Sequence, residues 1–169
     1  MTRWRAKIVF ISGMALLSGW AVAGAKMPDK LQEMQAKFDR ETNAVHKAKF
    51  LEKLGDAQFE ETRRASKAQE YGNVALVFEK YRDNARAALA GLKKLHRDAE
   101  RQSGGYRQLE INVRRSIREV KESLLIVPED YRPPLEIVQK DLSAIDDELI
   151  GMLFRNHHPQ KTESPLEEK

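Results

Sequence analysis

The chain of 169 residues contains no cysteine. This absence excludes a lipoprotein, because lipid attachment after export requires a cysteine at the new N-terminus. It also excludes disulfides, thiolate metal sites, covalent haem attachment and thiol nucleophiles. A domain built from this chain must therefore be held together by its hydrophobic core alone.

Aromatic residues are also scarce, at 7% of the chain, whereas charged residues make up 33%. A helical bundle with a narrow apolar seam tolerates this composition better than a sandwich or an α/β domain does. The net charge of +4 does not indicate a nucleic-acid partner, because three of the cations and no acid lie in the first 25 residues. The rest of the chain has a net charge of +1. We therefore expect an all-α protein that binds no nucleic acid.

Long hydrophobic runs are absent except near the N-terminus. Cations at positions 3, 5 and 7 precede an uncharged apolar run over residues 8–20, and small residues then permit cleavage after Ala25 or Ala23. This pattern predicts a signal peptide over residues 1–25 and export to the periplasm or the exterior of a bacterium. The alternative is an uncleaved membrane anchor over residues 8–25, which is at the lower length limit for a membrane-spanning helix.

Glycine and proline are infrequent in the rest of the chain, and they divide it into segments. The breakers are Pro28-Asp29, Tyr71-Gly72-Asn73, Ser103-Gly104-Gly105, and Val127-Pro128 through Pro133-Pro134. Four segments of helix-forming composition lie between these positions. We predict a single domain over residues 26–154, an antiparallel up-down bundle of about four helices, because short links make consecutive helices reverse direction.

The second segment has the most regular apolar pattern. Asn73 is a natural N-cap residue, and apolar residues after it recur alternately four and three positions apart. These residues are Val74, Phe78, Tyr81, Ala85, Ala88, Leu92, Leu95 and Ala99. We expect this helix to end at Ser103-Gly104-Gly105, where glycine can adopt the left-handed conformation that terminates helices.

The first segment, residues 29–70, is the least regular. Its apolar stripe changes phase at Gly55, which predicts a long first helix that is kinked or split near Gly55. Residues 60–70 contain few apolar side chains, so we expect a solvated helix end, with a projecting arm as the alternative. Residues 155–169 at the other end of the chain are polar and without periodicity, which predicts a disordered tail.

No motif for catalysis, metal binding or cofactor binding is present. His157 and His158 lie together in the predicted tail, and His96 with Glu100 could supply only two ligands, whereas zinc needs three or four. No glutamate is followed three residues later by histidine, which excludes the Glu-x-x-His motif of di-iron bundles. No serine lies in a G-x-S-x-G or S-x-x-K motif. We therefore predict a protein without catalytic activity, metal or cofactor.

Basic side chains on two of the predicted helices are the candidates for a partner-binding surface. They are Arg63, Arg64, Lys67, Arg114, Arg115 and Arg118. The sequence favours a scaffold or accessory subunit of the cell envelope that acts through protein–protein contacts, and a homo-oligomer is open. The alternative is a periplasmic holdase-type chaperone, and a third hypothesis is a bundle that binds a small molecule between its helices. Membrane contact is expected only through an uncleaved N-terminal segment.

Overall fold

The structure, a computed structural model, describes residues 28–96 and 98–154, so the predicted signal peptide and the predicted tail lie outside it. The described residues form five α-helices and a short 3-10 helix, with no strand among them, which confirms an all-α protein. The helices are α1 (Asp29–Arg40), α2 (Ala44–Lys67), α3 (Tyr71–Lys94), α4 (Gly104–Ile126), η1 (Glu129–Tyr131) and α5 (Arg132–Leu153). No helix in this part of the chain is both long and apolar enough to cross a lipid bilayer.

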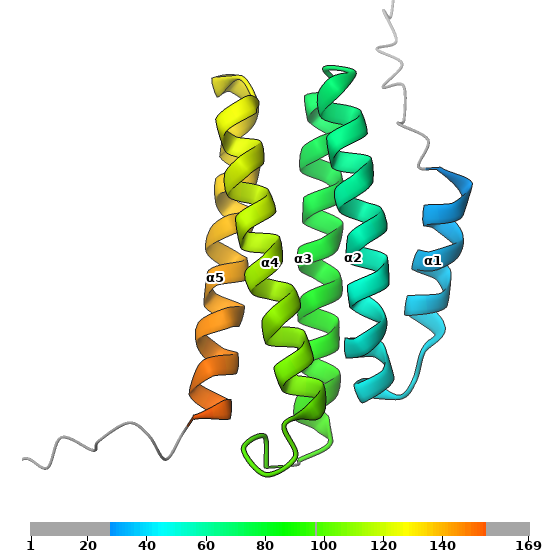
Figure 1. Cartoon of the computed structure of the whole chain (residues 1–169), viewed down its shortest axis with the longest axis vertical. Coiled ribbons are helices and arrows are strands. Elements are labelled where there is room, and N and C mark those ends of the chain that lie inside the picture. The colour runs from blue at the N-terminus through cyan, green and yellow to red at the C-terminus, as the bar shows by residue number, and fades with distance from the viewer. Residues whose placement is uncertain (1–27, 97, 155–169) are drawn as a thin grey trace, which may run out of the picture.

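Helices α2 to α5 lie side by side, and α1 packs along α2 at the edge of the molecule (Figure 1). The chain reverses direction at each connection, so α2 and α4 run one way and α3 and α5 run the other (Figure 1). Although α3 and α4 are consecutive, α4 packs mainly on α2 and α5, and α3 packs mainly on α2 and α5. The long connection from Lys94 to Gly104 therefore carries the chain diagonally across one end of the helices.

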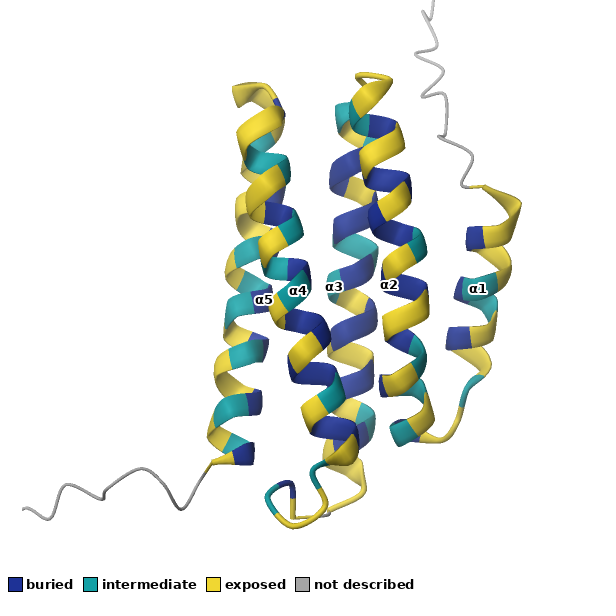
Figure 2. Ribbon diagram, viewed as in Figure 1, coloured by how far each residue is buried: buried dark blue, intermediate teal, exposed yellow. Residues whose placement is uncertain are grey.

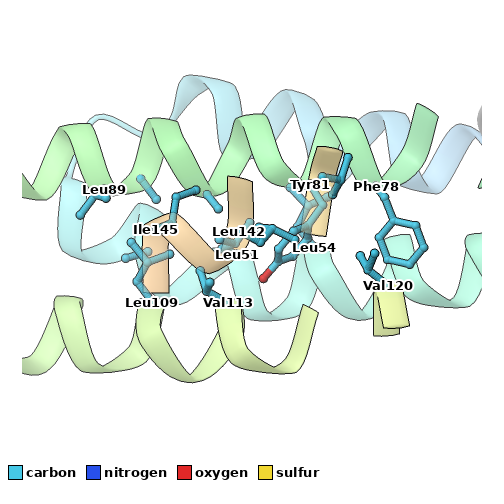
Figure 3. Close-up of a cluster of buried hydrophobic side chains, with 14 of the residues drawn as sticks. Leu51, Leu54, Phe78, Tyr81, Leu89, Leu109, Val113, Val120, Leu142 and Ile145 are labelled. Carbon is cyan, nitrogen blue, oxygen red and sulfur yellow. The ribbon is translucent and has the colours of Figure 1, made fainter. Parts of the chain in front are cut away.

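The core is formed by the inward faces of these helices, whereas the outward faces are exposed (Figure 2). Large side chains from α2, α3, α4 and α5 meet there, among them Leu54, Tyr81, Leu109 and Leu142 (Figure 3). Six members of the predicted stripe on the second segment are buried along α3. They are Val74, Phe78, Tyr81, Ala85, Ala88 and Leu92.

Both predicted ends of this helix are wrong. It begins at Tyr71 rather than after Asn73, whose side-chain amide donates a 2.9 Å hydrogen bond to Glu70 inside the first turn. It ends at Lys94, because His96 adopts a positive φ of 50° and turns the chain. Gly105 belongs to α4 and has no positive φ, so it does not terminate a helix. A Cβ at this position would lie 2.7 Å from Cδ2 of Leu92. The glycine therefore allows α3 and α4 to pack closely.

The predicted kink or split near Gly55 is also wrong, because α2 is continuous through this residue. A Cβ at position 55 would lie 2.8 Å from Cε2 of Tyr81, so the glycine makes room for a buried ring rather than bending the helix. The break occurs instead between Arg40 and Ala44. There the side chain of Asn43 accepts hydrogen bonds from the backbone N–H groups of Val45 and His46, which caps α2.

The polar stretch at the end of α2 does not project from the molecule. Thr62 and Ala65 are buried, and the helix ends at Lys67, close to the start of α3. Helices α2 and α3 each contain 24 residues and lie side by side along their length (Figure 1). The alternative of a projecting arm is therefore wrong.

Candidate functional site

Two of the predicted partner-binding cations lie at the seam between α2 and α4. The Nη2 atom of Arg63 donates to both carboxylate oxygens of Glu119, and Arg115 forms an ion pair with Asp56. The guanidinium of Arg115 also lies 5.5 Å from the ring centroid of Phe59. Both guanidinium groups are thus held by carboxylates of the neighbouring helix, which reduces the positive charge that the seam presents to a partner.

Arg114 lies on a different side of α4, at the seam with α5. Its Nε atom is 2.6 Å from a Glu110 oxygen and 3.3 Å from an Asp146 oxygen. The carboxylates of Glu110 and Asp146 are largely buried, whereas the guanidinium is half exposed. Arg114 therefore bridges two acids that would otherwise repel each other, and its first role is to join α4 to α5.

The remaining three cations lie near the end of α2 and on the outer face of α4. Arg64 donates two hydrogen bonds to Glu61, 2.9 and 2.7 Å long, and these bonds raise the pKa of the guanidinium above its usual value. Lys67 and Arg118 are exposed and form no ion pair with any residue in the ranges 28–96 and 98–154. The structure does not gather the six predicted cations into one basic patch, and their role in partner binding stays a prediction.

The interior contains polar groups that the apolar pattern did not indicate. The hydroxyl of Tyr81 donates a 2.9 Å hydrogen bond to the backbone carbonyl of Asn112, and its ring packs 5.1 Å from that of Phe59. Burial raises the pKa of the Tyr81 hydroxyl far above its usual range, so this group stays protonated as a donor. Tyr106 likewise donates to the carbonyl of Leu92. Both hydroxyls tie one helix to the backbone of another rather than forming a reactive group.

Gln58 on α2 is the least satisfied polar residue of the interior. Its side chain is fully buried, and neither the amide nitrogen nor the amide oxygen has a hydrogen-bond partner among the residues described. Gln35 provides the contrast, because its amide exchanges two hydrogen bonds with the buried amide of Asn84, 3.0 and 2.9 Å long. A buried amide without partners destabilises the folded state by about 1–3 kcal/mol.

We expect Gln58→Met, which keeps the side-chain length and removes the amide, to raise the free energy of unfolding by about 1–2 kcal/mol. Gln35→Met is the matched control. It leaves the Asn84 amide buried without its partner and should lower the free energy of unfolding by a similar amount. Urea unfolding of both variants measures the two values. If Gln58→Met were as destabilising as Gln35→Met, the Gln58 amide would be fully hydrogen-bonded in the native protein.

One surface groove lies between α3 and α5. It has a volume of about 410 Å³, and the small residues Ala90 and Ala144 are among those that line it. Its charged rim is internally paired, with Arg86 bound to Asp141 and Lys93 bound to Glu148. Among the described residues there is no cluster of three or more histidine or acidic side chains that could hold a metal ion. His157 and His158 lie outside these residues.

The turn from α4 into α5 exposes large apolar side chains. Leu125 is 83% exposed, Ile126 is 64% exposed and Tyr131 is 45% exposed. We call these three residues the corner patch. The ring of Tyr131 packs 5.7 Å from that of Tyr71, which fixes the turn against the start of α3. Sequence reasoning missed the patch, although one signal was available: Leu125 and Ile126 lie off the apolar stripe that α4 buries.

Comparisons with protein-family models, with curated proteins and with solved structures give no match. Its function must therefore be inferred from its own residues.

Proposed function

We propose that the protein is an exported, non-catalytic scaffold or accessory subunit of the cell envelope that acts through protein–protein contacts. Helices α2 to α5 would form an antiparallel up-down bundle that serves as a rigid platform. The observation that carries the proposal is the corner patch, where Leu125, Ile126 and Tyr131 are exposed at a turn that is itself well fixed.

The side chains of the corner patch leave large apolar groups in contact with water. Single apolar residues on a surface are ordinary, but adjacent large ones mark sites of interaction. Full burial of a leucine or isoleucine side chain contributes about 1.5–3 kcal/mol, so a partner that covers Leu125 and Ile126 gains appreciable affinity from two residues. The patch also adjoins Val127, which is buried, so its backbone is anchored.

The charged groups support a structural role for most of the remaining surface. Ion pairs join α2 to α4, α4 to α5, and α3 to α5, and each uses side chains that a binding site would otherwise present. An open groove with an internally paired rim favours neither catalysis nor tight binding of a small molecule. The N-terminal signal pattern supports location in the periplasm or outside the cell.

The experiment compares two double variants of the tagged protein in its native envelope. Leu125→Asn with Ile126→Asn removes the two most exposed residues of the corner patch. Leu76→Asn with Ile111→Asn removes two apolar residues elsewhere, one 60% exposed on α3 and one 51% exposed in the first half of α4. We expect one protein to be cross-linked stoichiometrically to the wild type and to the second variant but not to the first. All three forms should melt at nearly the same temperature, because exposed substitutions change stability by only about 0.5 kcal/mol.

The other functions predict different results for the same variants. A holdase would attach to many unrelated clients, and it would suppress the aggregation of an unfolded test protein in proportion to its exposed apolar surface. Both double variants would then lose activity. If the wild type captured no protein and instead gained thermal stability from a small-molecule extract, the scaffold proposal would be wrong and ligand binding would be supported.

A further inference from the structure

Helix α1 is attached to the rest of the protein by a narrow face. Only Leu31, Gln35 and Phe38 are buried along it, at spacings of four and three, and the remaining side chains are mostly exposed (Figure 2). It packs along α2 and reaches α3 through the Gln35–Asn84 amide pair. A groove of about 250 Å³ remains between α1 and α2, lined by Lys30, Ala57 and Glu60 among others. We call the surface of α2 and α3 that α1 covers, including Asn84, the seat of α1. The groove shows that α1 does not fill this seat completely.

The connection to α2 is short and contains no residue that forces a turn. Glu41, Thr42 and Asn43 include no glycine or proline, and none of them adopts a positive φ. Side-chain hydrogen bonds hold the turn, from the Asn43 N–H group to Glu41 and from the Val45 and His46 N–H groups to Asn43. The Glu41 N–H group, at the end of α1, donates to backbone carbonyls of α1. These bonds can be exchanged for a further turn of helix, which would join α1 and α2 into one continuous helix.

The seat left by α1 is specific in its chemistry. Asn84 is 3% exposed and presents both a donor and an acceptor, which only a correctly placed amide side chain satisfies together. A helix that occupies the seat must also carry an apolar residue four positions before that amide residue and a large apolar residue three positions after it. Gln35, Leu31 and Phe38 of α1 fulfil these conditions. The occupant that fits the seat is therefore an α1 helix.

We infer that α1 exchanges between copies of this chain, so that α1 of one molecule occupies the seat on α2 and α3 of a second molecule. Opening of the turn at residues 41–43 makes α1 continuous with its own α2 and carries it away from its own seat. The α1 helix of the second molecule then fills that seat and forms the same Gln35–Asn84 pair across the two chains. Exchange of an identical element costs little free energy, because both seats are filled in the dimer as they are in the monomer. This inference does not depend on the corner patch.

Single thiols test the exchange, because the chain has no cysteine of its own. Lys30 and Glu60 are exposed and line the same groove from α1 and α2. Full chains carrying Lys30→Cys and Glu60→Cys, with tags of different mass, are mixed, incubated at high concentration and treated with a short bismaleimide. The expected result is a covalent heterodimer in several-fold excess over a control that pairs Lys30→Cys with Lys140→Cys on α5. A doubly substituted chain, diluted before treatment, should cross-link internally.

A heterodimer no more abundant than that of the control, while the doubly substituted chain cross-links internally, would overturn the inference. A second variant replaces Glu41, Thr42 and Asn43 with alanines, which removes the side-chain hydrogen bonds that Glu41 and Asn43 accept and favours a continuous helix over the turn. Light scattering should show that this variant is a dimer with an unchanged helical circular-dichroism signal. A folded monomer would also contradict the exchange.

Discussion

Replacing Leu142 by aspartate should abolish cooperative folding. Leu142 on α5 is fully buried among the apolar side chains of the core shown in Figure 3. The substitution removes a buried leucine and places a charge in an apolar site, so we expect the free energy of unfolding to fall by at least about 5 kcal/mol. A loss of this size approaches the whole stability of a typical domain. Thermal melting followed by circular dichroism measures it.

Ile137→Asp on the same helix is the control. Ile137 is 58% exposed, so the new carboxylate remains solvated, and the expected loss is below about 1 kcal/mol. Cooperative melting of Leu142→Asp near the wild-type temperature would show that α5 does not bury this face. Unfolding of both variants would show instead that α5 tolerates no added charge.

Replacing Gly55 by valine should have the second largest effect. The ring of Tyr81 lies against the backbone of α2 at this glycine, and its hydroxyl is bound to the carbonyl of Asn112 on α4. A side chain at position 55 therefore cannot be accommodated unless the ring moves and gives up that hydrogen bond. We expect a loss of about 3 kcal/mol from overpacking and the displaced hydroxyl. Denaturant unfolding provides the value.

Gly151→Val gives the matched comparison. A Cβ at position 151 on α5 meets no heavy atom within 4 Å, so the substitution changes only local helix propensity. We expect it to be neutral within about 0.5 kcal/mol, since valine is a somewhat better helix former than glycine. Equal effects of the two substitutions would mean that Gly55 is not needed for the close packing of Tyr81.

The apolar periodicity predicted the interior of the helices more reliably than their ends. The stripe from Val74 to Leu92 is buried as expected, because a regular spacing of three and four defines one helix face whatever the neighbours are. The ends of α2 and α3 are followed by Gln69 and His96, which adopt positive φ. Neither residue is a typical turn residue, so the sequence did not indicate these ends. Local sequence favours Gly104 as a helix end, whereas packing of Gly105 against Leu92 places both glycines at a helix start.

Gly55 illustrates why a residue type alone can mislead. Glycine within a helical pattern suggests a break, but here it provides space for a side chain from α3, which only the three-dimensional packing reveals. The actual break at Asn43 is marked by a weaker signal, an amide residue that can cap a helix. Whether the basic residues bind a partner stays a prediction. The pairing of Arg63, Arg115 and Arg114 with Glu119, Asp56 and Asp146 could not be predicted, because it depends on the order of helices around the bundle.

Site-specific photo-cross-linking from position 125 in living cells tests the proposed function most directly. A photoreactive amino acid replaces Leu125, and a control places the same group at Lys140, which is exposed on α5. Protein–protein contact through the corner patch predicts one dominant adduct from position 125, identified by mass spectrometry, and none from position 140. Absence of any adduct at position 125, or the same set of adducts from both positions, would contradict a specific partner at the corner patch.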